Sequence, residues 1–196
     1  MALSVLLPMG AARADCPPPE AIETGIEVTY AKPANDPNTD VFRRLPDGRI
    51  ELLWTDAGDV NRDILEGGVF WSFSQPLTNG VPDGLPLLRE ADPPFAAGDR
   101  PVPGGRWDSR VRILWAPDDI EKVTLTFEWK AMETRDIGGC NLNVLPGTAV
   151  ESGSRDGTFR QDLLYLPDYG VTIVTAYAFN QKPITRLTPT DIRAVP

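Results

Sequence analysis

Residues 122–130 read KVTLTFEWK, and their side chains alternate strictly between polar and apolar. Successive side chains of a β-strand point to opposite faces, so this period of two is typical of a strand with one buried face. Twenty prolines and seventeen glycines punctuate the chain and leave little room for long helices. The sequence therefore predicts an all-β protein of short antiparallel strands joined by tight turns.

Similar strand patterns recur along the whole chain. The predicted strands cover residues 26–30, 40–45, 49–54, 68–74, 111–115, 123–129, 140–144, 158–166, 171–180 and 184–188. Two connections, Pro46-Asp47-Gly48 and Pro167-Asp168-Tyr169-Gly170, are predicted hairpin turns, because proline presets φ and glycine accepts a positive φ. About nine or ten such strands favour a single antiparallel curved sheet, folded as a barrel, a half-barrel or a sandwich.

Residues 75–110 depart from this pattern, because prolines recur throughout the segment. Proline cannot donate a hydrogen bond to a strand ladder, so the segment is predicted to be one long Pro-rich loop inserted in the β domain. Leu85, Leu87, Leu88 and Phe95 favour a lid that folds onto the surface. A solvated connection between two strands is the alternative.

The first residues, MALSVLLPMGAARAD, combine an apolar stretch with a small-x-small pattern at Ala12-Arg13-Ala14. This pattern is typical of a secretory cleavage site. We therefore predict a signal peptide over residues 1–14 and a single β domain over residues 15–196, located in the periplasm. An apolar N-terminal strand is the alternative.

The sequence contains two cysteines, Cys16 and Cys140. In an exported chain, two cysteines favour one disulfide bond, here between the Pro-rich N-terminal region and the second half of the domain. A redox-active pair would more typically show C-x-x-C spacing.

The charge balance excludes one class of partner. The chain has 28 acidic and 19 basic residues and a net charge of -9, so it should repel nucleic acids. After the predicted signal peptide, no stretch approaches the roughly 18 apolar residues that a membrane-spanning helix needs. We expect a monomer without a transmembrane segment.

One stretch, GDVNRDILEGG at residues 58–68, has the D-x-N-x-D spacing of some calcium loops. Its candidate ligands are Asp59, Asn61 and Asp63. A calcium loop of this type needs glycine at its sixth position and glutamate at its twelfth, where this chain has Ile64 and Phe70. A short helix that begins at Asp59 and ends at Gly67 accounts for more of the residues. We expect neither a metal nor another cofactor.

Catalytic residues are scarce. The chain has no histidine, which excludes Ser-His-Asp and Cys-His catalysis and most zinc sites. Two acidic pairs, Asp118 with Asp119 and Asp162 with Asp168, could serve glycoside hydrolysis. Acidic residues at strand ends are more often turn formers, so a non-enzymatic protein is expected.

Aromatic residues are the remaining candidates for a binding site. Most of them should belong to the core. A curved sheet can nevertheless hold a ligand on its concave face, and we predict that Trp71, Phe73, Phe127 and Trp129 line one cavity there.

The region NLNVLPGTAVESGSRDGTFRQDLLYLPDYGVTIVTAYAF, which begins at Asn141, resembles uncharacterised exported β-proteins of Gram-negative bacteria. In that pattern, a strand that ends near Pro146-Gly147 leads to an aromatic-x-Pro-x-x-Gly hairpin, which is Tyr165 to Gly170 in this chain. Some such proteins are similar to the half-barrel of periplasmic lipoprotein carriers, which shelter acyl chains on a concave face. The resemblance implies a lipid-like ligand and no catalytic residues.

Two functions are compatible with these features. The first is a periplasmic protein that binds an apolar or amphipathic ligand on a concave aromatic face, with residues 75–110 as a cover. The second is an interaction module of the cell envelope that recognises another protein through the Pro-rich loop or a sheet edge.

Overall fold

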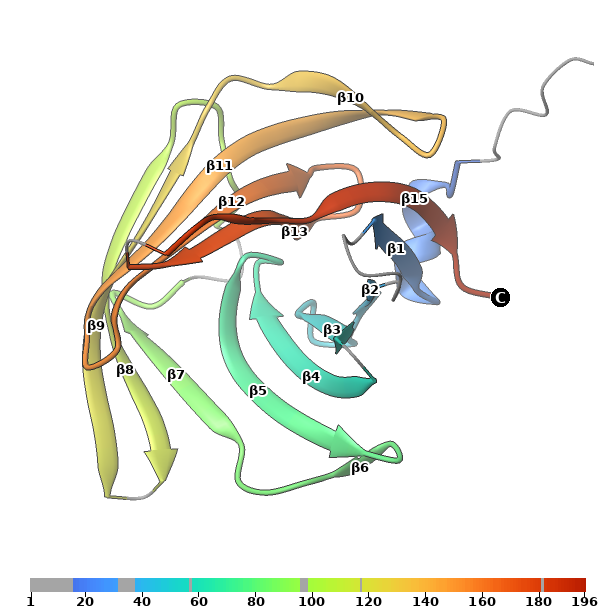
Figure 1. Cartoon of the computed structure of the whole chain (residues 1–196). Helices are drawn as coiled ribbons and strands as arrows, with labels where there is room; N and C mark the ends of the chain where they lie inside the picture. Colours follow the sequence, from blue (N-terminus) through green and yellow to red (C-terminus); the bar gives the residue numbers. More distant parts are fainter. Residues whose placement is uncertain (1–15, 32–37, 57, 96–98, 117, 181) are drawn as a thin grey trace, which may run out of the picture.

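Antiparallel strand pairing runs through almost the whole chain in the computed structural model, which describes residues 16–31, 38–56, 58–95, 99–116, 118–180 and 182–196 (Figure 1). A short 3-10 helix, η1 (Pro19–Glu23), precedes the strands. The strands are β1 (Ile26–Ala31), β2 (Asn38–Arg44), β3 (Ile50–Asp56), β4 (Asp59–Glu66), β5 (Phe70–Thr78), β6 (Val81–Pro82), β7 (Leu87–Asp92), β8 (Arg106–Ala116), β9 (Asp119–Trp129), β10 (Glu133–Ile137), β11 (Cys140–Ser154), β12 (Gly157–Leu166), β13 (Val171–Phe179), β14 (Thr185–Arg186) and β15 (Thr188–Ala194). The predicted signal peptide lies outside the described residues.

All strands belong to one sheet, which curves into a nearly closed barrel. Its order is β14-β13-β12-β11-β9-β8-β7-β5-β4-β3-β2-β1-β15, with β10 added to β11 and β6 added to β5. The consecutive strands β14 and β15 connect the two ends of this order. Arg186 of β14 pairs with Ala176 of β13, and Thr188 of β15 pairs with Ala31 of β1. The prediction of a single antiparallel curved sheet is confirmed.

The predicted number of strands was too low, since the described residues form fifteen. Much of the difference comes from residues 75–110, where the prediction of one long loop is wrong. This segment contains the end of β5, all of β6 and β7, and the start of β8. Pro82 lies in the two-residue strand β6 and Pro93 follows β7, so these prolines stand where a missing N–H does not interrupt a long ladder.

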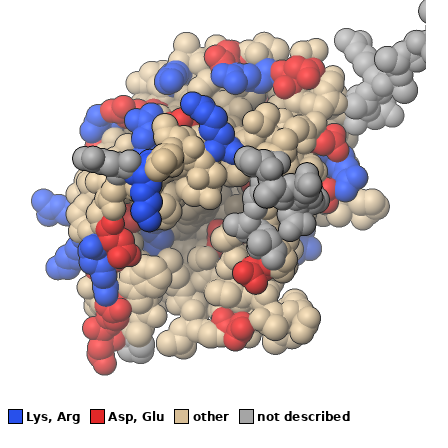
Figure 2. Space-filling view, in the orientation of Figure 1, with Lys and Arg blue, Asp and Glu red and all other residues tan. Residues whose placement is uncertain are grey.

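The barrel has two different ends. We call the end with the β4–β5, β7–β8 and β12–β13 connections the closed end, because its inward-facing Phe70, Trp129 and Tyr165 are at most 8% exposed. The opposite end, with the β3–β4, β8–β9 and β11–β12 connections, is the open end. There, Phe179 is 45% exposed. The space-filling view shows a hollow in the face that Figure 1 presents (Figure 2).

Two hydrophobic cores lie on opposite sides of the β12–β13 hairpin. The inner core fills the barrel with side chains of β8, β9, β11 and β12, including Leu163 and Tyr165. The outer core lies on the other side of the hairpin. There, Leu164 and Leu166 pack with buried side chains of β1 to β4, β10, β11 and β15. Residues 163–166 are therefore buried on both faces, which hides their alternation in the sequence.

Several contacts fix the closed end. The predicted disulfide between Cys16 and Cys140 is present, with Cα atoms 5.5 Å apart. The Tyr169 hydroxyl, in the predicted β12–β13 turn, donates a hydrogen bond of 2.7 Å to the Pro17 carbonyl. Gly68 lies so close to the same turn that a Cβ atom on it would be 1.9 Å from the Gly170 carbonyl oxygen. None of the described helices is long and apolar enough to span a membrane.

Candidate functional site

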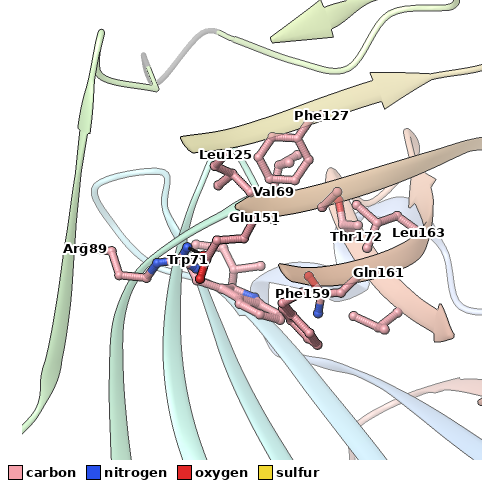
Figure 3. Close-up of a pocket in the computed structure, with 13 residues that line it drawn as sticks. Val69, Trp71, Arg89, Leu125, Phe127, Glu151, Phe159, Gln161, Leu163 and Thr172 are labelled. Atoms are coloured by element: carbon pink, nitrogen blue, oxygen red, sulfur yellow. Dashed lines mark hydrogen bonds and ion pairs between the residues drawn. The ribbon is translucent and has the colours of Figure 1, made fainter. Parts of the chain in front are cut away.

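A small cavity lies inside the barrel between the two ends (Figure 3). Its volume is about 30 Å³. Its apolar lining is Leu65, Val69, Trp71, Leu125, Phe127, Ala149, Phe159, Leu163 and Val174, and its polar lining is Arg89, Glu151, Gln161 and Thr172. These side chains come from β4, β5, β7, β9, β11, β12 and β13 and from the β4–β5 connection, so the cavity is a property of the closed barrel rather than of one hairpin.

Two polar atoms at this cavity have no hydrogen-bond partner. They are the Thr172 hydroxyl, on a residue that is 7% exposed, and the Nε of Arg89. A water molecule needs roughly 10–15 Å³ of such space, so the cavity in its present shape has the size of one or two waters. A larger molecule would have to displace side chains to fit there.

Arg89 and Glu151 form a buried ion pair beside the cavity. The Arg89 guanidinium donates to the Glu151 carboxylate, and both side chains are at most 15% exposed. The guanidinium carbon also lies 5.7 Å from the centre of the Phe70 ring. Burial lowers the pKa of Arg89, while the carboxylates of Glu151 and Asp63 act in the opposite direction.

Asp63 extends this polar group across the barrel. Its Oδ2 accepts a hydrogen bond of 2.8 Å from the Trp54 indole N–H, but its Oδ1 has no partner although the residue is only 5% exposed. Burial raises the pKa of Asp63 to about 6, against hydrogen bonds from Ser74 and Trp54 and the charge of Arg89, which lower it.

A second carboxyl group, Asp40, lies beside Trp54 in the strand register. Its Oδ2 accepts a hydrogen bond of 2.6 Å from the Tyr30 hydroxyl. Burial raises the pKa of Asp40 to about 7, and the nearby charge of Asp63 adds to the effect, while the hydrogen bond from Tyr30 opposes it. We call the part of the barrel from the Arg89–Glu151 pair to the open end the open half. It holds acidic groups that are costly to ionise.

The four predicted binding aromatics do not share one environment. Trp71 and Phe127 line the cavity. Trp129 is buried toward the closed end and stacks with Phe127 at a centroid distance of 6.2 Å. Whether any of them contacts a ligand stays a prediction.

The expectation that Phe73 faces the same cavity is wrong. Phe73 pairs with Leu88, which is 39% exposed and stands next to the inward-facing Arg89, so Phe73 lies on the outer face. The guanidinium of Arg62 lies 5.9 Å from the centre of its ring. The reason is a β-bulge opposite Ile64 and Leu65, which shifts the alternation between Trp71 and Phe73.

The calcium-loop and helix interpretations of residues 58–68 are both wrong, because Asp59 to Glu66 form strand β4. Asp59, Asn61 and Asp63 occupy alternate positions of this strand. Alternate residues of a strand are about 6.6 Å apart, so they cannot wrap one ion as consecutive loop ligands do. Across the residues that the structure describes, no three His, Cys, Asp or Glu side chains gather closely enough to hold a metal ion.

Members of the two candidate acidic pairs have basic neighbours. Asp119 accepts from Arg155 at 2.6 Å, and Asp162 accepts from Arg160 at 3.1 Å. Asp168 lies in the β12–β13 turn, as expected of a turn former.

Sequence reasoning missed the polar residues of the barrel interior, namely Tyr30, Asp40, Asp63, Arg89, Glu151 and Thr172. A signal for two of them exists in the strand patterns. Arg89 stands between Leu87 and Ala91 at alternate positions of β7, and Glu151 follows Ala149 in β11. A charge in register with an apolar face predicts an inward-facing polar residue.

Comparison with known proteins reveals no relative: no family model, no curated protein and no solved structure matches this chain. The site is therefore interpreted from its own geometry.

Proposed function

We propose that this protein is an exported, non-enzymatic binding protein that holds a small amphipathic ligand in the open half of its barrel. The observation that carries the proposal is the mixed lining of the cavity, in which apolar side chains adjoin two polar atoms without partners. Ligand sites typically combine an apolar wall with a few polar groups that orient the ligand.

The arrangement supports one orientation of the ligand. Trp71, Phe127 and Phe159 offer apolar surface to a chain or ring, and the polar side chains that extend from the Arg89–Glu151 pair to Asp63 offer contacts to a head group. Phe159 stacks on Phe179 at 4.4 Å, and Phe179 is 45% exposed. Rotation of this pair would widen the cavity without disturbing the closed end.

The resemblance to lipoprotein carriers supports a lipid-like ligand, although here the sheet is nearly closed rather than a half-barrel. The disulfide between Cys16 and Cys140 supports an oxidising compartment such as the periplasm.

Filling the cavity tests this proposal. The full chain would be incubated with 1-decanol, decanoate or decylammonium and analysed by native mass spectrometry. Ala149, which is 3% exposed, lines the cavity, whereas its neighbour Val150 in β11 points to the other face. Ala149→Leu should abolish the adduct, because its side chain occupies the binding space, and Val150→Leu should keep it.

Folding of both variants would be checked by circular dichroism, since overpacking a core costs roughly 1–3 kcal/mol. Equal adducts in both folded variants would contradict a site in the cavity. Bare protein under all conditions would favour the interaction module instead.

A further inference from the structure

The inward face of the open half has an excess of negative charge. Among the described residues at inward positions of β2 to β11 near the cavity and the open end, Arg89 is the one base. Arg44 also occupies an inward position of β2, but it lies toward the closed end and donates to the Tyr169 carbonyl. The carboxylates at such positions near the cavity and the open end are Asp40, Asp63, Glu121 and Glu151. Arg89 is already paired with Glu151, and Glu121 accepts a hydrogen bond from the Trp115 indole at 3.3 Å and lies 3.5 Å from Arg155. Within the part of the chain that the structure describes, neither Asp40 nor Asp63 has a basic partner within ion-pair distance.

One carboxylate oxygen of Asp63 also lacks a hydrogen-bond donor. The residue is 5% exposed, and its Oδ1 has no partner, whereas its Oδ2 accepts from the Trp54 indole. Leaving a buried carboxylate oxygen without a donor is costly, more so than for a neutral group. At the open end of β2, the Oδ1 of Asn38 is likewise buried without a partner. The partner that Asp63 and Asn38 lack is thus a donor, which an ammonium group provides and an ionised carboxylate does not.

Trp54 adds a second feature that favours a cation. It lies opposite Asp40 in the β2–β3 register and donates its indole N–H to Asp63. Its side chain packs against the outer core but is only partly buried. An ammonium group beside an indole ring gains cation–π attraction in addition to its ion pairs.

From this geometry we infer that the ligand's head group is a cation, an alkylammonium, held between Asp40, Asp63 and the indole of Trp54. The inference rests on the proposed function and specifies its ligand. An anionic head group would instead meet the surplus of carboxylates.

The inference has a consequence for pH. The groups that face Asp40 are Tyr30 from β1, Trp54 from β3 and Asp63 from β4, and those that face Asp63 are Trp54, Ser74 and Arg89. Burial raises the pKa of Asp40 to about 7 and that of Asp63 to about 6, so both carboxyl groups hold protons in mildly acidic solution. A bound cation must displace these protons. Its affinity should therefore fall as the pH is lowered from 7.5 to 5.

The test compares three probes of equal chain length on the full protein. Isothermal titration calorimetry at pH 7.5 would measure decylammonium, 1-decanol and decanoate. We expect decylammonium to bind about tenfold more tightly than 1-decanol, with decanoate weakest. Titrations in two buffers of different ionisation enthalpy should show proton release when decylammonium binds at pH 6.5.

Variants sharpen the result. Asp63→Asn and Asp40→Asn should each weaken decylammonium about tenfold and leave 1-decanol unchanged. Both are close in shape to the protonated carboxyl group, so the fold should persist. Asp108→Asn is the matched control, because Asp108 lies on the outer face of β8 and pairs with Arg106.

The outcomes separate the two proposals. Decanol or decanoate binding as tightly as decylammonium, or an unchanged ammonium affinity in both Asn variants, would overturn the cation inference and leave the proposed function intact. Failure of all three probes to bind the wild-type protein would remove the proposed function and the inference with it.

Discussion

At the closed end of the barrel, aromatic rings touch in an unbroken series from Phe95 through Trp107, Phe127 and Trp129 to Tyr165, with centroid distances of 5.2 to 6.2 Å. At the open end, the inward positions hold carboxyl groups, and the stacked rings of Phe159 and Phe179 are partly in solvent. The same strands reach both ends, so the difference lies in the side chains.

This difference separates the source of stability from the site of binding. Buried aromatic residues contribute large apolar areas and favourable ring contacts. Buried carboxyl groups and polar atoms without partners instead lower the stability of the folded state. The closed end can therefore stabilise an open half that is itself unfavourable, a distribution common around binding sites.

The largest expected effect is at the closed end. Gly68 has a φ of +72°, and a Cβ atom there would lie 1.9 Å from the Gly170 carbonyl oxygen, so Gly68→Ala should cost more than about 4 kcal/mol and prevent stable folding. Gly80→Ala is the control near the open end. Its φ of +76° is similar, but no atom lies within 4 Å of the new Cβ, so it should cost about 1 kcal/mol. Urea denaturation would measure both, and equal losses would show that the Gly68–Gly170 contact does not matter.

Aromatic truncation should separate the two ends by a smaller margin. Phe127→Ala removes a ring that is 4% exposed and in contact with the rings of Trp107 and Trp129, so it should lower the free energy of unfolding by about 4 kcal/mol. Phe159→Ala removes a half-buried ring beside the exposed Phe179 and should cost about 1 kcal/mol. Chemical denaturation of both variants is the measurement. A larger loss for Phe159→Ala would reverse the assignment of the two ends.

The open half should also give an unusual dependence of stability on pH. The pKa values of Asp40 and Asp63 are raised in the folded protein to about 7 and about 6, so the folded state binds more protons than the unfolded state between pH 5 and 8. Stability should therefore fall as the pH rises through this range, by roughly 2–4 kcal/mol, where the lower figure allows for the partial exposure of Asp40.

Urea denaturation at pH 5, 6, 7 and 8 would show this loss, and Asp40→Asn should remove much of it. Asp47→Asn is the control, since Asp47 is exposed and its hydrogen bond with Arg49 lowers its pKa, so its effect falls at lower pH. A stability that rises with pH in the wild-type protein would contradict the raised pKa values.

The sequence predicted best where a strand has one buried and one exposed face. Strand β9 alternates cleanly from Val123 to Trp129, and the β12–β13 turn follows from local residue types. The Cys16–Cys140 bond follows from the presence of two cysteines in a chain that is predicted to be exported. Prediction failed where the chain departs from this simple case. The short strands of residues 75–110 are interrupted by prolines at their ends, and β4 shows no clear alternation because Asp63, Ile64 and Leu65 are all buried.

The site was harder to predict than the fold for a related reason. A one-residue bulge reverses the face of every later side chain in a strand, and no sequence pattern announced the bulge before Phe73. Asp40 and Asp63 look like ordinary surface carboxylates in the sequence. Only the folded barrel shows that they face its interior, where Trp54 donates a hydrogen bond to Asp63 and Tyr30 donates one to Asp40.

The segment that closes the barrel also sets the order in which the protein can form. Strand β1 pairs with β15, and Ile26 lies opposite Ala194. One of the two neighbours of β1 therefore comes from the far end of the sequence. Contacts of such large sequence separation form slowly, because a long loop must close first. Until then β1 is an unprotected edge that can pair with another chain. Assembly of the barrel should thus carry its greatest risk of aggregation just before its last strand docks.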